Sequence, residues 1–464
     1  MRGSVSRFAA VPRDRTARVV VGVFIVGAAI RVWFLLEGPP AFLGFSDAWQ
    51  YIATAQGQYS QDQVHPAGYP LFLRLAHHLS SDIAWTVFLQ HALGVATALL
   101  LYLAVARMTG SRLAGLFPAV FVLLDGLALV LEHTLMTETL FAFALAGYGY
   151  AAVRAWDGGL GWCAAAGAFA ALATVVKSTG LLLAVMLVVL LLLRWGGGAR
   201  GWKQRLLPAG AGLLAATAAL GLYLVWLGGE PGAPKVSVSP SSGRVLYSRV
   251  APFADCHDFT PPAGTERLCE TTPASARQGT NYYLWYPSNP AWRAYGAPPG
   301  GDGALRSFAL AAIAGQPTAY LSAVGHDLEQ YVRSPGVPSY LDFATHVMPV
   351  VTEQTKPYYH YAGGPAIAAD SALLTFSRAT MTRGWVLLLL ALAPIASLAL
   401  TRGRERWGVI VFGATGWLMV LGSVAGANYD PRYAVVVLGP LAAATAPAVL
   451  RLARRLRGVT PALR

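Results

Sequence analysis

The sequence predicts an all-α polytopic membrane protein with about ten transmembrane helices and a mixed, loop-rich segment outside the membrane. Hydrophobic residues make up 55% of its 464 residues and charged residues only 12%, whereas soluble domains carry about 25% charged residues. Long uncharged stretches recur along the chain, as helices that cross a bilayer require. Gly and Pro are frequent, with 49 and 29 residues, and membrane helices tolerate both better than soluble helices do.

Ten apolar stretches are candidate membrane spans. We expect these spans at residues 19–36, 84–106, 113–130, 135–153, 162–176, 180–193, 207–227, 384–400, 408–427 and 433–450. The fifth and sixth could merge into one span, but Lys177 would then lie inside the bilayer at a cost of about 3 kcal/mol. Two shorter helices place Lys177 at a membrane surface instead. No small-residue cleavage site follows the first stretch, so it is interpreted as a retained helix.

The basic residues predict how the spans are oriented. With a cytoplasmic N-terminus, the inner segments are residues 1–18, 107–112, 154–161, 194–206, 401–407 and 451–464. They hold most of the basic residues of the membrane part, as short cytoplasmic loops do. Residues 228–383 hold 11 basic and 11 acidic residues, so the net charge of +13 arises elsewhere in the chain. The charge therefore indicates topology in a plasma membrane, and no nucleic-acid partner is expected.

The chain divides into three predicted parts. Residues 1–227 form an N-terminal membrane region whose external loops carry the candidate site, residues 228–383 form an extracytoplasmic lid or acceptor-binding segment, and residues 384–464 form the last helices and a basic cytoplasmic tail. The alternating start of the middle segment, GEPGAPKVSVSPSSGRVLYSRVAPF, predicts a few strands. Residues 304–332 predict two amphipathic helices along the membrane surface, broken at Gln316-Pro317.

The middle segment also holds two of the three cysteines. Cys256 and Cys269 can form a disulfide if this segment faces an oxidising compartment, although the sequence does not fix the distance between them. Cys163 lies in an apolar stretch and is expected to be buried.

Ionisable residues gather at the predicted outer ends of the helices, where such groups are costly and usually functional. Asp47, in FSDAWQY, follows the first span and would share one helix face with Tyr51. A carboxylate placed there could act as a general base, although a loop acid or a helix cap is the simpler alternative. In HPAGYPLFL (65–73), a turn would launch a helix and hold His65 and Tyr69 at its mouth, or serve architecture alone.

Two further acids and two cations complete the candidate set. Glu138 would lie in the first turn of a helix, where the helix dipole favours an anion, and it could orient an acceptor or hold a divalent cation. Glu132 and His133 precede it. One Asp, one Glu and one His from distant loops are too few to predict a metal site. Lys177 and Arg432 could clamp a lipid phosphate. The simpler alternatives are that Lys177 snorkels to lipid headgroups and that Arg432 pairs with a nearby carboxylate.

Five sequence blocks together resemble a known family. They are Asp47 with Tyr51, HPAGYPLFL (65–73), LMTETLF (135–141), VVKSTGLLL (175–183) and DPRYAVVV (430–437). In order and spacing they resemble the membrane glycosyltransferases of the GT-C superfamily, in the polyprenyl-phosphate-sugar-dependent branch that includes protein mannosyltransferases and the aminoarabinose transferases of lipid A. Protein mannosyltransferases carry two adjacent acids in the first loop, whereas Ala48 follows Asp47 here.

The resemblance implies a role for each residue of the set. Asp47 would be the catalytic base and Glu138 a second active-site acid, while Lys177 and Arg432 would hold the donor phosphate. The remaining candidates would shape the pocket: Tyr51, His65, Tyr69, Glu132, His133 and Tyr433.

The resemblance also implies the partners and the reaction. The donor would be a polyprenyl-phosphate-linked sugar, and the acceptor a hydroxyl of a glycan, lipid, protein or peptide product. Transfer would invert the anomeric centre on the extracytoplasmic face. The resemblance does not require a cofactor, and whether the reaction uses a divalent cation is left open.

Three alternative functions remain. A lipid-sugar flippase usually shows symmetry between its halves, and no internal repeat is evident here. A ligase or polymerase that uses a lipid-diphosphate donor would favour external arginine and histidine clusters over a leading Asp. A non-enzymatic membrane scaffold is the third alternative.

Overall fold

The computed structural model describes residues 15–194, 202–233, 237–333, 341–361, 363–364 and 366–456. Parts of the predicted cytoplasmic segments, residues 1–14, 195–201 and 457–464, lie outside these ranges. The longer helices are α1 Arg15–Glu37, α2 Asp47–Ala55, α3 Gly68–Leu79, α4 Ile83–Thr109, α5 Arg112–Leu124, α6 Gly126–Glu132, α7 Glu138–Ala155, α8 Leu160–Val176, α9 Leu181–Arg194, α10 Trp202–Gly228, α11 Ser242–Val250, α12 Thr280–Trp285, α13 Pro290–Tyr295, α14 Asp302–Gly315, α15 Pro317–Arg333, α17 Pro349–Tyr359, α18 Ala372–Thr380, α19 Gly384–Leu400, α20 Gly403–Gly426 and α21 Pro431–Leu456. Short 3₁₀ turns are η1 Tyr59–Gln61, η2 Ser178–Gly180, η3 Glu266–Leu268, η4 Ala274–Ala276 and η5 Asp342–Thr345.

The all-helical, multi-span prediction is confirmed. Six stretches of the described chain are long and apolar enough to cross a membrane: Arg15–Glu37, Ile83–Thr109, Leu206–Gly228, Ala372–Leu400, Gly403–Gly426 and Pro431–Leu456. The pair α5 and α6, bent by 59° at its break, would make a seventh. The other three predicted spans correspond to helices α7, α8 and α9, and the chain does break at Lys177, between α8 and α9.

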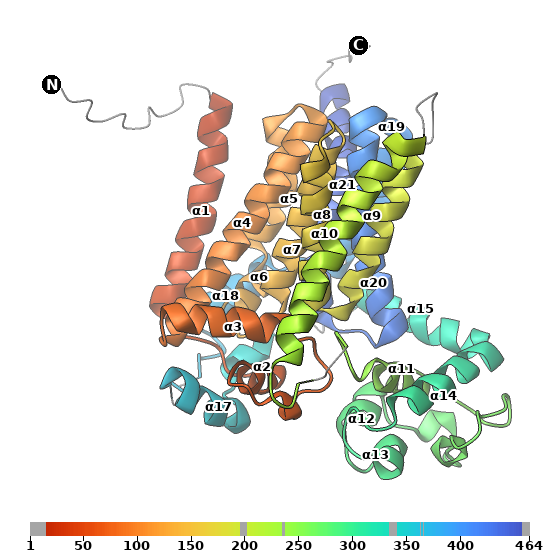
Figure 1. Ribbon diagram of the computed structural model, residues 1–464. Helices are drawn as coiled ribbons and strands as arrows, with labels where there is room; N and C mark the ends of the chain where they lie inside the picture. Colours follow the sequence, from red (N-terminus) through yellow and green to blue (C-terminus); the bar gives the residue numbers. More distant parts are fainter. Residues whose placement is uncertain are drawn as a thin grey trace.

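The bundle is arranged around its last helix. In the apolar stretch of α21, 67% of the residues are buried, whereas only 17% are buried in α1, which stands at the outer edge of the bundle (Figure 1). Glycines allow the close approach of neighbouring helices, as in other membrane bundles. A Cβ on Gly149 of α7 would lie 2.1 Å from the Phe412 ring of α20. The tight packing gives the helix ends fixed positions on which a site can be built.

The predicted inner and outer segments lie at opposite ends of the bundle. At one end, Asp157 after α7 pairs with Arg107 of α4 at 2.5 Å and with Arg404 of α20. At the other end lie α2, α3, α17 and the group α11 to α15 (Figure 1). The junction between α8 and α9 at Lys177 and the start of α21 at Arg432 lie at the same end of the bundle as α11 and α12.

The expected strands of the middle segment are not found. Among the described residues there is no strand, only an isolated bridge between Phe42 and Thr134. Residues 242–250 form α11 instead, because Gly243, Tyr247 and Val250 are buried at helical spacing and pack against α14 and α12.

Two other expectations for the middle segment are confirmed. The chain breaks at Gln316, between α14 and α15. Cys256 and Cys269 form a disulfide, with their Cα atoms 5.8 Å apart. Cys163 is buried, as expected.

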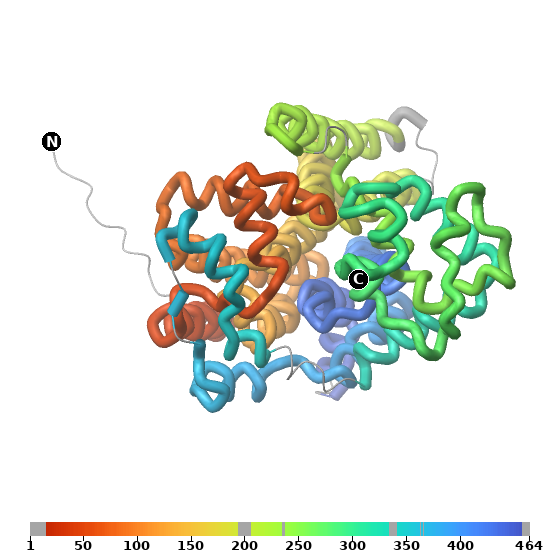
Figure 2. Tube along the Cα trace, turned by 90° about the horizontal axis from the view of Figure 1, so that it is seen from below, coloured from red at the N-terminus to blue at the C-terminus, as the bar shows by residue number. Residues whose placement is uncertain are grey.

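The middle segment divides into two bodies on different parts of the bundle (Figure 2). Helices α11 to α15 lie beside the end of α20 and the start of α21. Helices α17 and α18 lie near α2 and α6, where the Met348 N–H donates to Leu43 O at 3.1 Å and the Thr382 N–H donates to Asp125 at 2.7 Å. Helix α17 therefore covers α2 and the connection before it, while helices α11 to α15 face the end of α20.

Candidate active site

A cavity of about 430 Å³ lies between the ends of the membrane helices and the helices α11 to α14. Six predicted site residues line it: Asp47, Tyr51, His65, Lys177, Arg432 and Tyr433. The opposite wall comes from the middle segment, which contributes Ser242, Asn281, Trp285 and Arg306 among others. Segments that lie far apart in the sequence therefore line the same cavity.

Asp47 is placed by a buried connection between α1 and α2. Phe42, Leu43 and Phe45 are nearly inaccessible to solvent, and a Cβ on Gly44 would lie 1.7 Å from Phe343 O, so only glycine fits there. The connection ends in α2, whose first residue is Asp47. As predicted, this residue begins a helix, and Tyr51 lies one turn further on the same cavity wall.

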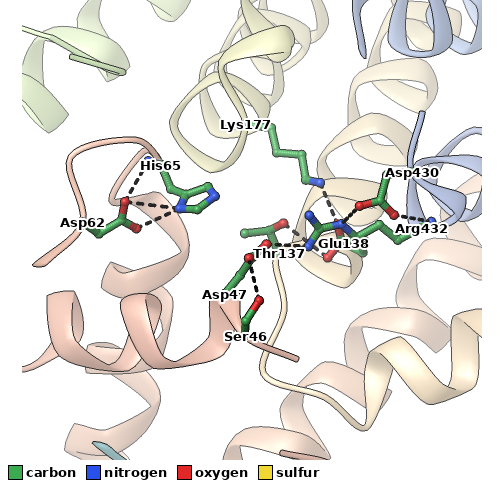
Figure 3. Close-up of polar contacts among 9 residues, drawn as sticks. All are labelled: Ser46, Asp47, Asp62, His65, Thr137, Glu138, Lys177, Asp430 and Arg432. Carbon is green, nitrogen blue, oxygen red and sulfur yellow. Dashed lines mark hydrogen bonds and ion pairs between the residues drawn. The ribbon is translucent and has the colours of Figure 1, made fainter. Parts of the chain in front are cut away.

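Four predicted residues meet in one network of ion pairs (Figure 3). Lys177 Nζ donates to Glu138 Oε1 at 2.6 Å. Arg432 Nη1 donates to Asp47 Oδ2 at 2.7 Å, and its Nε lies 3.7 Å from Glu138 Oε1. Asp430 joins the network, since its Oδ2 accepts from Arg432 Nε at 2.9 Å. The network thus brings together α2, α7, the α8–α9 break and the start of α21.

Local structure explains how each charge reaches the network. Asp430 accepts the backbone N–H of Arg432 at 3.1 Å and so fixes the first turn of α21. Glu138 opens α7, where the positive helix end stabilises an anion. Lys177 lies in extended backbone between helices, and its Nζ lies 4.4 Å from the centre of the Tyr433 ring, within cation–π range.

The network holds three carboxylates and two cationic side chains. Burial would raise the pKa of Asp47, but Arg432, His65 and Lys177 outweigh burial and lower that pKa to about 2. Burial lowers the pKa of Lys177, although Glu138 opposes this. Lys177 and Arg432 are both paired with carboxylates. An anion that binds them must therefore displace a carboxylate or bind beside it against charge repulsion.

His65 forms a second pair on the cavity wall. Its Nδ1 lies 3.0 Å from Asp62 Oδ2, and Asp62 also accepts the N–H groups of Val64 and His65, which shapes the turn (Figure 3). Burial would lower the pKa of His65, but Asp62 and Asp47 raise it above 6.5. The Trp285 ring of α12 stacks on the imidazole with ring centres 5.9 Å apart, so the middle segment touches the HPAG turn.

Three predicted pocket residues lie behind the cavity wall. Tyr69 is fully buried, packs against the Tyr51 ring and donates to Gln90 Oε1 at 2.7 Å. Glu132 and His133 are also buried and do not line the cavity. The network of ion pairs therefore does not include Tyr69, Glu132 or His133.

Glu132 and His133 belong to a separate buried chain of polar contacts. Glu132 pairs with Arg31 at 2.7 Å and with His91 Nδ1 at 2.9 Å. His91 Nε2 lies 3.0 Å from His133 Nδ1, and His133 Nε2 donates to Pro39 O at 2.7 Å. Burial, with His91 beside it, lowers the pKa of His133 to about 3, so this ring is neutral. The chain ties α1 and the connection that follows it to α4 and α6.

Sequence reasoning singled out neither Asp62 nor Trp285 as a site residue. Asp62 lies three residues before His65, a spacing that could have suggested an Asp–His pair. Trp285 offered no signal, because its contact with His65 crosses 220 residues of chain. Within the described residues, no group of three or more His, Cys, Asp or Glu side chains could hold a metal ion.

Comparisons with solved structures find membrane transferases of low identity. The chain is 18% identical to the S. cerevisiae protein O-mannosyltransferase Pmt1-Pmt2 complex bound to the sugar donor, over 46% of this chain and 33% of that chain, with a TM-score of 0.36. It is 15% identical to the Archaeoglobus fulgidus oligosaccharyltransferase AglB in complex with an inhibitory peptide and a dolichol-phosphate, over 96% and 52%, with a TM-score of 0.47. It is 15% identical to ArnT from Cupriavidus metallidurans bound to undecaprenyl phosphate, over 95% and 79%, with a TM-score of 0.36.

The chain thus spans 33% and 52% of the length of the first two of these structures. No curated protein matches it significantly. A family model does: residues 64–226 match the dolichyl-phosphate-mannose-protein mannosyltransferases. This matched region contains the HPAG turn, Glu138 and Lys177. The match covers 163 of the 464 residues, and over this region the chain is similar to that family.

Proposed function

We propose that this protein is an inverting glycosyltransferase that moves a sugar from a polyprenyl-phosphate carrier to an acceptor hydroxyl on the extracytoplasmic face of the plasma membrane. One observation carries the proposal: Asp47, Lys177 and Arg432 line one cavity, and the buried Glu138 behind its wall joins them in a single network of ion pairs. The family match over residues 64–226 supports it. Such a network offers a base, a second acid and two cations within reach of one reacting centre.

The donor phosphate would bind Lys177 and Arg432. Arginine and lysine are the usual protein ligands of phosphate oxygens. Because Arg432 already pairs with Asp47 and Asp430, the phosphate and Asp47 compete for one guanidinium. When the phosphate takes over Arg432, Asp47 loses the contact that holds its pKa near 2 and becomes a stronger base. Donor binding would in this way prepare the base.

The transfer itself is a single displacement. The carboxylate of Asp47 takes the proton of the acceptor hydroxyl, and the acceptor oxygen forms a bond to the anomeric carbon from the face opposite the phosphate. The bond between the anomeric carbon and the phosphate oxygen breaks, and its electron pair leaves with the polyprenyl phosphate. Lys177 and Arg432 stabilise the negative charge that develops on this leaving group. Glu138 holds Lys177 in place at 2.6 Å.

The acceptor would enter from the side of the middle segment. Ser242, Asn281, Trp285 and Arg306 face the network across the cavity, and they supply hydrogen-bonding groups and an aromatic ring. We assign residues 228–383 the role of a lid and acceptor-binding segment. The acceptor class, whether glycan, lipid, protein or peptide product, is set by this wall.

The proposed topology has ten spans with the cavity on the outer side. The disulfide between Cys256 and Cys269 supports this orientation, because disulfides persist in oxidising compartments. The basic residues at the opposite end, Arg107, Arg154 and Arg404, support it as well.

Donor consumption by the purified protein in lipid bilayers tests the function. With a polyprenyl-phosphate-linked hexose and a set of acceptor hydroxyls, we expect stoichiometric release of polyprenyl phosphate and a product of inverted anomeric configuration. Movement of the donor across the bilayer without its consumption would instead indicate a flippase. A product that retains the donor's anomeric configuration would contradict the single displacement.

A further inference from the structure

One helix of the middle segment lies along the loop that carries Asp430. Helix α15 presents Tyr320, Asp327 and Tyr331, spaced by seven and four residues and so on one helix face. The loop runs over residues 427–430, between α20 and α21. Just before the loop, in the last turn of α20, Ala425 O accepts from Tyr320 Oη at 2.9 Å.

The other two side chains hold the end of the loop. Asp327 Oδ2 accepts the N–H of Tyr429 at 3.0 Å, and Tyr331 Oη donates to Asp430 O at 3.2 Å. The Tyr331 ring also packs edge-on against the Tyr429 ring, with centres 4.6 Å apart. Three residues on one face of α15 therefore hold the backbone at Ala425, Tyr429 and Asp430.

Asp327 is itself held firmly. Arg249 of α11 pairs with it at 2.7 Å, and the side chains are only 5% and 14% exposed. Such a pair is weakly screened by solvent and costly to break on one side. The Arg249–Asp327 pair thus connects the body of the middle segment to the backbone of Tyr429.

Asp430, at the end of this loop, and Arg432, just after it, belong to the network of ion pairs. The Asp430 side chain accepts from both the backbone N–H and the Nε of Arg432. A shift of the backbone at Tyr429 or Asp430 therefore moves the Arg432 guanidinium, and sites of this kind are sensitive to displacements of a fraction of an ångström. Asp327 and Tyr331 do not line the cavity, so their effect on it must pass through other residues.

We propose that Asp327 and Tyr331 are positioning residues that place Arg432 for the donor phosphate through the backbone of Tyr429 and Asp430. This inference rests on the proposed function, in which Arg432 binds that phosphate. It assigns the middle segment a part in donor binding, in addition to its proposed contact with the acceptor.

The test measures phosphate affinity and not turnover alone. Farnesyl phosphate is titrated into the full-length protein in detergent, and farnesol, which lacks the phosphate, reports the binding of the prenyl chain alone. We expect Asp327→Ala and Tyr331→Phe to weaken farnesyl phosphate binding about three- to tenfold, the range that one lost hydrogen bond produces, and to leave farnesol binding unchanged. Glu329→Ala, on an exposed side chain of the same helix that pairs with Arg333, should leave both affinities unchanged.

A double-mutant cycle separates positioning from general support of the fold. In an Arg432→Gln background, Asp327→Ala and Tyr331→Phe should cause no further loss of affinity, since they act through Arg432. Tyr331→Phe removes one hydroxyl and keeps the ring packing, so it stays informative if Asp327→Ala fails to fold.

Two results would overturn the inference. One is wild-type farnesyl phosphate affinity in Asp327→Ala or Tyr331→Phe, and the other is an equal additional loss in the Arg432→Gln background. If the wild-type protein binds farnesyl phosphate no better than farnesol, the proposed function fails first. If it binds the phosphate and Tyr331→Phe does so equally well, only the positioning role fails.

Discussion

Arg432 Nη1 donates to Asp47 Oδ2 across 2.7 Å, so the proposed base and a proposed phosphate ligand are each other's partners before any donor binds. The two residues lie 385 positions apart in the sequence and meet only because α2 and the start of α21 close on the same cavity. Each of the two groups is thus already paired with an opposite charge before the donor arrives. This contact also predicts that one substitution can impair catalysis and improve donor binding at the same time.

Replacement of Asp47 should therefore tighten phosphate binding. In Asp47→Asn the competing charge is absent, and we expect farnesyl phosphate to bind about fivefold more tightly, which corresponds to roughly 1 kcal/mol. Isothermal titration with the purified variants measures this affinity. Asp82→Asn is the matched control, because Asp82 caps α4 outside the cavity and Asn caps a helix equally well. Weaker binding in Asp47→Asn would contradict the competition between carboxylate and phosphate.

The Lys177–Glu138 pair should show strong coupling in stability. Glu138 is 1% exposed, so Lys177→Gln leaves this buried carboxylate with only the longer contact to Arg432, at 3.7 Å, and should cost about 3 kcal/mol of folding free energy. The double variant Lys177→Gln/Glu138→Gln removes both charges and should recover most of that loss. Thermal unfolding of the single and double variants measures the coupling. We expect the double variant to remain inactive, since a stable fold without Lys177 still lacks a phosphate ligand, and full activity in it would exclude Lys177 from donor binding.

The His65–Asp62 pair predicts how stability depends on pH. The pKa of His65 lies above 6.5 in the folded protein, because Asp62 and Asp47 outweigh burial and Arg432. A raised histidine pKa stabilises the fold below the unfolded pKa of about 6.5, and this stabilisation is lost as the pH rises through the folded value. The unfolding midpoint of the wild type should fall over that interval, and Asp62→Asn should flatten the change. His257→Gln, at an exposed histidine outside the cavity, should keep the wild-type slope. An unchanged slope in Asp62→Asn would exclude this pair as its source.

The Trp285 ring should matter for the acceptor and not for the donor phosphate. It lines the cavity opposite the ion network, so Trp285→Ala should raise the KM of the acceptor about tenfold, the upper range for one aromatic contact, with farnesyl phosphate affinity unchanged. Tyr286→Ala is the control, because Tyr286 is 58% exposed and does not line the cavity. An equal effect of both variants, or a loss of phosphate affinity in Trp285→Ala, would contradict the assignment of this wall to the acceptor.

Cysteine labelling in intact cells tests which end of the bundle faces outward. After mild reduction, a membrane-impermeant maleimide should label Cys256 and Cys269, which form the disulfide, while the buried Cys163 stays unlabelled. A cysteine introduced by Gly161→Cys, at the opposite end where a Cβ meets open space, should react only after the cells are permeabilised. The reverse pattern would place the cavity in the cytoplasm.

The sequence predicted the parts of the site that depend on local patterns. Asp47 after the first apolar stretch, Glu138 at a helix start and Lys177 at a break between two helices all follow from periodicity and the cost of burying charge. The strands predicted in the stretch that begins the middle segment are wrong, because the alternating residues before α11 concealed the helical spacing of the buried residues within it. Contacts such as Trp285 with His65 and Asp327 with Tyr429 join residues far apart in the chain. No local pattern encodes them, since they depend on how the middle segment packs on the bundle.

The most direct test of the central claim is a single turnover of pre-bound polyprenyl-phosphate-linked sugar by the wild type and by Asp47→Asn. We expect Asp47→Asn to bind the donor at least as tightly as the wild type and to release polyprenyl phosphate about 10²–10⁴-fold more slowly, the usual contribution of a general base. Release at a near wild-type rate from donor-saturated Asp47→Asn would contradict the account, because the network around Arg432 would then not contain the base.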